Sequence, residues 1–164
     1  MGLPLSVRIV RVDALPEGFE ELAADAVADG ERVLDVLRED WRAGALRFDA
    51  PGEALFAAYA GGALLGMGGL TRDPYLKSEP VGRVRRLYVR RAARRHGAGR
   101  ALLEAIVAGA RDAAWPRLRV RAPVAAFAFY ERIGFLRAVG EASATHMLTL
   151  AVTAAIIPLR RGAP

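Results

Sequence analysis

The stretch RRHGAGRA, residues 94–101, lies between a strand-like run that ends at Val89 and a helical pattern that continues to about Ala113. The start of a helix leaves about four backbone N–H groups unpartnered at the positive end of the helix dipole, where they attract phosphate. Gly97 and Gly99 lack a Cβ, so a phosphate can approach their backbone closely. The arginines add charge-assisted donors. The stretch therefore predicts a strand, a phosphate-binding turn and a helix.

The pattern Arg94-x-x-Gly97-x-Gly99 resembles the Q/R-x-x-G-x-G/A signature of GCN5-related N-acetyltransferases (GNAT), in which this turn holds the pyrophosphate of acetyl-coenzyme A (acetyl-CoA). The later segment FYERIGF, residues 129–135, is similar to the F-Y-x-x-x-G-F segment of that family. The resemblance is sharp over residues 84–135 and rests on element order over the rest of 5–150. It implies an enzyme that moves acetyl from acetyl-CoA to a primary amine by direct attack in a ternary complex.

The resemblance also implies which residues hold acetyl-CoA. In the family, backbone groups of the strand before the turn pair with the pantetheine arm, and a backbone N–H near Tyr88 or Val89 would stabilise the oxyanion. The cofactor-binding residues implied are Leu87, Tyr88, Val89, Arg94, Arg95, His96, Gly97, Ala98, Gly99 and Arg100. Pro123 departs from the pattern, because the family often has an asparagine there that contacts the cofactor.

Tyr130 is the catalytic residue that the resemblance implies, because the family often places there a tyrosine that protonates the leaving thiolate. A phenol can serve as a general acid near neutral pH, and a tyrosine that merely lines the cofactor channel is the alternative. The general base is not identified, because residues 80–93, where many relatives carry a glutamate, contain no carboxylate. Its candidates are a water relay or one of Glu53, Asp73, Glu79 and His146.

The length of 164 residues predicts one acetyltransferase domain over residues 1–153, followed by a C-terminal tail at 154–164. The absence of cysteine excludes disulfides and thiolate metal ligands, and two histidines are too few for a histidine-built metal centre, so we expect no metal. No apolar run approaches the ~20 residues of a membrane span. Charged residues interrupt any signal-peptide pattern before Leu15. We therefore expect a cytoplasmic protein without a membrane partner.

The net charge of +6 hides an asymmetry, because residues 1–53 hold 12 of the 18 acidic residues and only 6 of the 24 basic ones. The basic remainder suits a polyanion such as coenzyme A. The acidic part flanks the acceptor site in the family, which favours a cationic acceptor, either a small molecule or a peptide amine. The arginines between residues 83 and 100 also suit nucleic acid, but no nucleic-acid-binding signature accompanies them. A catalytically weak acyl-CoA-binding sensor of the same fold is a further alternative, and a homodimer is one option for assembly.

Periodicity and turn residues predict strands at 5–12, 54–60, 63–70, 83–89, 118–122, 135–139 and 145–152, and helices at 17–28, 31–42, 98–113 and 124–133. This order predicts an α+β fold with a mixed, mostly antiparallel sheet of about seven strands flanked by about four helices, as in GNAT proteins. Glycines in the strand at 63–70 predict a bulge or a close backbone approach. The resemblance also implies that two parallel strands splay apart near Tyr88 and Leu118.

Overall fold

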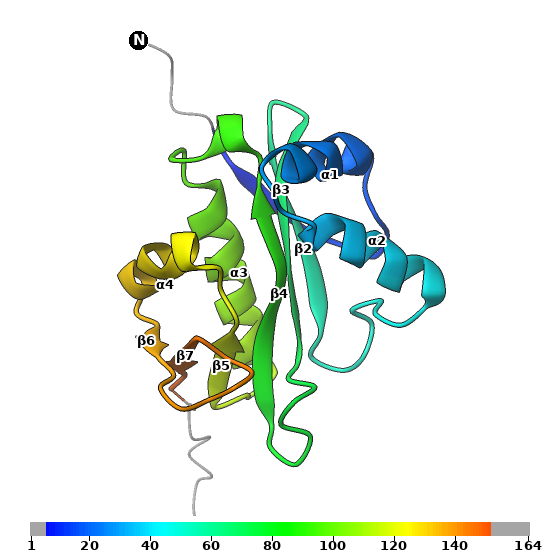
Figure 1. The fold of residues 1–164 in the computed structure, drawn as a ribbon. Helices are drawn as coiled ribbons and strands as arrows, with labels where there is room; N and C mark the ends of the chain where they lie inside the picture. Colours follow the sequence, from blue (N-terminus) through cyan, green and yellow to red (C-terminus); the bar gives the residue numbers. More distant parts are fainter. Residues whose placement is uncertain (1–5, 152–164) are drawn as a thin grey trace, which may run out of the picture.

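One mixed sheet organises residues 6–151, which are the residues that the computed structural model describes. Its strand order is β1-β2-β3-β4-β5-β7-β6 (Figure 1). The strands are β1 (Arg8–Val12), β2 (Ala54–Ala60), β3 (Ala63–Arg72), β4 (Val81–Val89), β5 (Arg117–Val120), β6 (Leu136–Arg137) and β7 (His146–Thr149). The helices are α1 (Phe19–Ala28), α2 (Val33–Ala43), α3 (Ala98–Asp112) and α4 (Phe127–Ile133), and the 3₁₀ turns are η1 (Arg91–Ala93) and η2 (Val124–Ala126). The expected fold class is confirmed.

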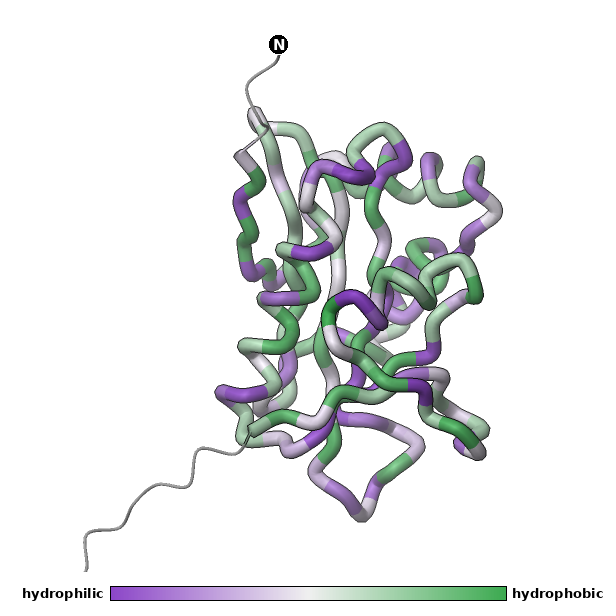
Figure 2. Tube along the Cα trace, turned by 90° about the vertical axis from the view of Figure 1, so that its left-hand side faces the viewer, coloured by the Kyte–Doolittle hydropathy of each residue, from purple (hydrophilic) through white to green (hydrophobic). Residues whose placement is uncertain are grey.

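The helices form two layers, with α1 and α2 on one face of the sheet and α3 and α4 on the other (Figure 1). Each layer closes its own core: Leu22 and Leu34 pack with Met67 on the first face, whereas Leu103 and Ile106 of α3 belong to the core of the second. Figure 2 shows short hydrophobic and hydrophilic stretches alternating along the chain, as amphipathic elements require. Within residues 6–151, no helix combines the length and apolar character needed to cross a membrane.

The sheet opens between β4 and β5, its one parallel neighbour pair within the described residues. These strands pair only where Val81–Arg83 meets Arg117–Arg119, and β4 then continues to Val89 without a partner on that edge. The implied splay is therefore present, but it begins later on β5 than expected. Leu118 is still paired, with Gly82, because the ladder extends one residue further along both strands.

The glycines of β3 shape β4 beside this opening. A Cβ at Gly66 would lie 2.6 Å from the Tyr88 carbonyl oxygen, and one at Gly68 would lie 2.8 Å from Leu87 Cδ1. The register slips at this point, because Met67 pairs with Tyr88 but Gly69 pairs with Arg85, which leaves an extra residue in β4. The predicted bulge and close approach are both confirmed. They set the course of the β4 backbone that leads into the turn before α3.

The last two strands are shorter than the sequence predicted. The strand expected at 135–139 is reduced to β6, because the chain turns away after residue 137, with Gly140 at φ +81°. Of the strand expected at 145–152, the described residues 145–151 form a strand only over β7, and residue 152 lies outside the described residues. The helix expected at 124–133 begins as the 3₁₀ turn η2 before α4. The predicted tail at 154–164 lies outside the described residues.

Candidate active site

A cavity of ≈ 750 Å³ lies along β4, on the edge that β5 leaves unpaired. Its wall comes from the α1–α2 connection, β4, the turn before α3, and the segment from β5 to α4. The predicted site residues that line it are Leu87, Tyr88, Val89, Arg94, Arg95, Gly99 and Tyr130, together with Pro123. The size is typical of a small-molecule site. The structure thus brings together Tyr130 and residues of the turn before α3, which are far apart in the sequence.

The remaining predicted residues of the turn, His96, Gly97, Ala98 and Arg100, do not contribute side chains to this wall in the described structure. Gly97 is the N-cap of α3, and its φ of +87° is the left-handed conformation that glycine adopts most easily. The first helical hydrogen bond runs from the Ala101 amide to the Gly97 carbonyl, so the amides of residues 98–100 precede the hydrogen-bonded part of the helix. The role of this turn therefore depends on its backbone donors. The Arg100 side chain instead pairs with Glu104 at 2.9 Å.

Arg94 connects the turn to two other elements. Its Nε donates to the Val89 carbonyl at 3.1 Å, and its guanidinium pairs with Asp29, which caps the end of α1, at 2.5 Å. The guanidinium also lies 5.5 Å from the centre of the Tyr88 ring. The side chain of the motif arginine is therefore engaged in holding the end of β4 against α1, and the free backbone amides are better placed than it to receive a phosphate.

The amide of Val89 is a β4 donor whose direction suits a group bound in the cavity. The next amide along the chain, that of Arg90, donates to the Leu65 carbonyl of β3 at 2.7 Å. Successive amides of an extended strand point to opposite edges, so the Val89 amide is directed away from β3 and toward the cavity. The Tyr88 side chain is committed elsewhere, because its hydroxyl donates to Asp25 of α1 at 2.6 Å. Burial, followed by this hydrogen bond, raises the pKa of the Tyr88 phenol.

Tyr130 stands on α4 with its ring in an aromatic group. The rings of Phe129 and Phe135 meet it edge-on with centroids 5.2 Å and 5.3 Å away, and the side chain is 4% exposed. Burial raises the pKa of the Tyr130 phenol well above its ordinary value, so the hydroxyl stays protonated at neutral pH. The hydroxyl has no hydrogen-bond partner within residues 6–151, and the residue lines the cavity. The arrangement offers a proton donor to a group bound there.

The four side chains considered as the general base do not line the cavity in the described structure. Asp73 is fully buried and pairs with Arg83 and Arg119. Glu79 pairs with Arg117. Each of these carboxylates already has an arginine partner, so neither is a free proton acceptor in this conformation.

The other two candidates are also engaged away from the cavity. Glu53 accepts the Arg72 amide at 3.3 Å. His146 is buried between Thr145, whose Oγ1 lies 3.0 Å from Nδ1, and Glu131, whose Oε1 lies 3.2 Å from Nε2. Its ring packs edge-on against Phe127, with centroids 4.7 Å apart. Through these contacts, His146 packs β7 against α4.

Two carboxylates that the sequence reasoning missed do line the cavity. They are Asp29 and Glu31, in the short connection between α1 and α2. Asp29 is paired with Arg94, whereas the Glu31 carboxylate makes no ion pair with another described residue. The sequence carries no motif for them. The acidic bias of residues 1–53 was the available signal, and it did not distinguish these two residues from ten others.

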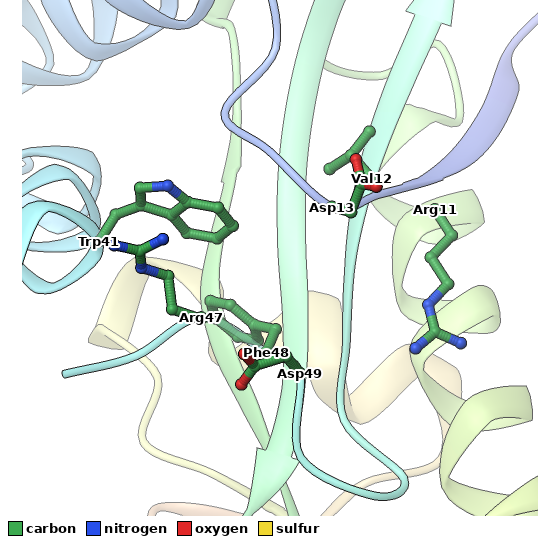
Figure 3. A pocket seen from close by; sticks show the side chains of 7 residues that line it. All are labelled: Arg11, Val12, Asp13, Trp41, Arg47, Phe48 and Asp49. Carbon is green, nitrogen blue, oxygen red and sulfur yellow. The ribbon is translucent and has the colours of Figure 1, made fainter. Parts of the chain in front are cut away.

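A smaller cavity of ≈ 290 Å³ lies between the end of β1 and the loop that follows α2 (Figure 3). It is lined by Arg11, Val12, Asp13, Trp41, Arg47, Phe48 and Asp49. The Arg47 guanidinium is 5.3 Å from the centre of the Trp41 ring. The wall described for this cavity includes neither the turn before α3 nor Tyr130. The larger cavity is therefore the candidate active site.

Comparisons with known proteins agree with this geometry. The family model described as the acetyltransferase (GNAT) domain matches residues 20–150. Among solved structures, the chain is similar to a protein from Exiguobacterium sp. 255-15 assigned as an acetyltransferase, with 30% identity and a TM-score of 0.79 over 88% of this chain and 94% of that one.

A GNAT-family acetyltransferase from Staphylococcus aureus Mu50 shares the fold, with 13% identity and a TM-score of 0.66 over 87% of this chain and 96% of that one. No curated protein matches the sequence significantly. The fold, the match to the family model and the relative at 30% identity support acyl transfer as the general activity. The chain belongs to the GNAT family of acetyltransferases.

Proposed function

We propose that this protein is an N-acetyltransferase that moves acetyl from acetyl-CoA to a primary amine by direct attack in a ternary complex. The observation that carries the proposal is the cavity along the unpaired edge of β4. The cavity is lined by Gly99 at the start of α3, where a helix N-terminus favours phosphate, and by Tyr130, whose hydroxyl could protonate the leaving thiolate. Family membership supports the same chemistry.

Backbone amides and arginines of this chain would hold the cofactor phosphates. The amides of residues 98–100 supply donors at the positive end of α3. Arg95, Arg121 and Arg132 also line the cavity, and none of them forms an ion pair within the described part of the chain. Guanidinium groups without a carboxylate partner are suited to bind phosphate oxygens. This set adds Arg121 and Arg132 to the residues that the motif implied.

The proposed reaction forms a C–N bond between the amine and the thioester carbonyl carbon and breaks the C–S bond. The Val89 amide would donate to the oxyanion that develops on the carbonyl oxygen. The Tyr130 hydroxyl would donate to the sulfur as it leaves. The amine loses one proton during the attack. We propose that Glu31 accepts this proton, directly or through water, because it is the cavity carboxylate left without an arginine within residues 6–151.

The direct test measures binding and turnover separately. Calorimetry with acetyl-CoA should show binding to the full chain, and an unbiased panel of amines should include acceptors that release free CoA from acetyl-CoA. Mass spectrometry should then find the acetyl group on the amine of the acceptor. Failure to bind acetyl-CoA would overturn the proposal.

The alternative of an acyl-CoA-binding sensor rests on the absence of a carboxylate from β4. Binding of acetyl-CoA without turnover of any amine would favour it. The nucleic-acid reading loses support, because Arg83, Arg86, Arg94 and Arg100 are paired with carboxylates inside the chain. We keep a cytoplasmic location as part of the proposal, in line with the absence of cysteine.

A further inference from the structure

Three arginines of β4, Arg83, Arg85 and Arg86, line the cavity beyond the strand segment assigned to the cofactor. Val84 packs into the core beneath α3, so its neighbours Arg83 and Arg85 project to the opposite face, on which α1 and α2 lie. Arg86 reaches the same layer, because it pairs with Asp40 of α2 at 2.8 Å. The wall of the cavity on this side therefore carries three arginines.

Two of these arginines already have carboxylate partners. Arg83 pairs with the buried Asp73 at 3.3 Å, and Arg86 pairs with Asp40. Arg85 differs, because its single hydrogen bond in the described structure runs from Nη1 to the Thr71 hydroxyl at 3.3 Å. It forms no ion pair with any described carboxylate. The Nε atom of Arg86 is buried and likewise has no partner within residues 6–151.

Arg85 thus has no ion-pair partner among the described residues, and the Asp40 carboxylate, which acts to raise the pKa of its guanidinium, is paired with Arg86. Burial lowers the pKa of the Arg85 guanidinium, and the neighbouring charges of Arg86 and Arg83 lower it further. An arginine nevertheless remains protonated at any working pH, so the cavity wall keeps the positive charge. A guanidinium that is partly removed from water and lacks a counter-ion stabilises any anion that can reach it.

The position of Arg85 assigns that anion to the acceptor. Arg85 precedes Val89 by four residues, which places it roughly 13 Å along the strand from the end that leads into the phosphate turn. Of the arginines available to the cofactor phosphates, Arg95 belongs to the turn, Arg121 directly follows β5, and Arg132 belongs to α4. A group bound at Arg85 therefore lies past the segment of β4, residues 87–89, that is proposed to pair with the pantetheine arm.

We infer that the acceptor amine carries an anionic group, a carboxylate or a phosphate, which is bound by the guanidinium of Arg85. The inference rests on the proposed acetyltransferase function. It reverses the expectation of a cationic acceptor drawn from the acidic bias of residues 1–53. Several of those carboxylates are already neutralised: Asp29 and Asp40 pair with cavity arginines, and Asp35 pairs with Arg38.

The test compares acceptors that differ only in the anion. The pairs are an α-amino acid with its carboxamide, and phosphoethanolamine with ethanolamine, and a polyamine serves as the cationic arm. We expect kcat/KM for the anionic member of one pair to exceed that of its neutral partner by about 10- to 100-fold, the range of a hydrogen-bonded charge. The preferred pair distinguishes carboxylate from phosphate. Preference for neutral amines or the polyamine would overturn the inference.

The variant Arg85→Gln should remove this preference, chiefly by raising KM for the anionic acceptor, and should change kcat/KM for the neutral partner much less. Arg85→Lys should restore part of it, because the charge returns without the fork of donors. Arg111→Gln is the matched control, since it removes one exposed arginine of α3 and should keep the preference. An unchanged preference in folded Arg85→Gln would refute the role of Arg85.

The readouts keep the two proposals apart. If acetyl-CoA binds and neutral or cationic amines are acetylated without preference for an anion, the acceptor inference fails and the acetyltransferase function stands. If acetyl-CoA does not bind, the proposed function fails. If Arg85→Gln does not fold, as judged by circular dichroism, the wild-type acceptor pairs and Arg85→Lys still decide the inference.

Discussion

Tyr130 shows how the surroundings of a residue set its chemistry. The rings of Phe129 and Phe135 exclude water from its own ring, and this burial raises the pKa of the phenol. A raised pKa keeps the Tyr130 hydroxyl protonated. It also makes complete proton transfer to a thiolate less favourable than it would be from a tyrosine of ordinary pKa. The hydroxyl is therefore expected to stabilise the leaving sulfur largely through a charge-assisted hydrogen bond.

Tyr130→Phe removes only the hydroxyl and keeps the ring in its aromatic group. We expect kcat to fall by about 10²-fold, the lower end of the range for a general acid, because the raised pKa limits the driving force. Acetyl-CoA affinity by calorimetry should hardly change. Pre-steady-state measurement of the chemical step avoids masking by product release. An unchanged rate of the chemical step would show that Tyr130 lines the cavity without donating a proton.

The variant Glu31→Gln tests whether Glu31 is the general base that accepts the proton of the amine. We expect kcat/KM at neutral pH to fall by about 10-fold to 10²-fold, since water can partly replace a positioned base. The loss should shrink as pH rises, because more of the amine is then already neutral. A pH–rate profile for the variant and the wild-type enzyme measures this. A loss that stays constant across the profile would argue that Glu31 acts in binding and not in proton removal.

The side chains outside the cavity serve as controls for the same experiment. Changes of Glu53 or Glu79 to Gln, and of His146 to Gln, should each cost less in kcat/KM than Glu31→Gln does, and in each case less than ~10²-fold, because none of these groups lines the cavity wall. His146→Gln is also expected to lower stability, since it disturbs the contacts with Thr145 and Glu131. If one folded variant is inactive at every pH, that residue is the dedicated base and Glu31 is not.

At the scale of elements, the phosphate turn depends on its neighbours as much as on its own glycines. A Cβ at Gly99 would meet Phe129 and Val89 at 3.5 Å, which is ordinary contact, so the position tolerates a small side chain. Gly99 nevertheless lines the cavity at the start of α3. A negative charge placed there would oppose a phosphate at the amides of residues 98–100.

Gly99→Glu should therefore abolish acetyl-CoA binding while the fold survives. Gly99→Gln has nearly the same size without the charge and should bind more tightly than Gly99→Glu, which separates charge from bulk. Gly99→Ala should retain measurable affinity because its Cβ fits. Calorimetry with acetyl-CoA on proteins of native circular dichroism makes the comparison. Undiminished affinity in Gly99→Glu would mean that the phosphates bind elsewhere.

At the scale of the whole molecule, one buried ionic network holds the sheet together where it begins to open. Asp73 follows β3 and pairs with Arg83 of β4 and Arg119 of β5, which face each other in the last paired position. Arg119 also bonds Ser143 and Glu141 in the loop before β7. Removing the carboxylate would leave the buried Arg83 without an ion-pair partner among the described residues and Arg119 with Glu141 alone, which is costly.

Asp73→Asn should lower the free energy of unfolding by about 3–5 kcal/mol, the usual cost of breaking a buried pair. Its activity should fall in step with the folded fraction, as expected for a structural residue. Denaturant unfolding measures the loss. Glu104→Gln, which breaks the exposed pair with Arg100, is the control and should cost at most about 1 kcal/mol. Equal effects from the two changes would show that the network does not stabilise the opening.

Much of the site could be predicted from local sequence, because its parts are local devices. The glycine turn before α3 and the FYERIGF segment each carry their role in a few adjacent residues. No motif reveals the residues whose role depends on which charged residue lies next to them in the fold. Arg85 and Arg86 are alike in sequence, yet Arg86 meets Asp40 and Arg85 meets no described carboxylate. Pairing across 46 residues leaves no local signal.

The sequence by itself determined the order of strands and helices, because this order follows from side-chain periodicity. It also determined the bulge beside the glycines of β3 and the helix start at Gly97, because both follow from the missing Cβ of glycine. Only the tertiary structure decided which charges remain free. It paired Asp29, Asp40 and Asp73 with arginines, and it placed His146 in the core. The physical reason is that the free energy of a charge depends on its burial and its nearest opposite charge, and folding sets both.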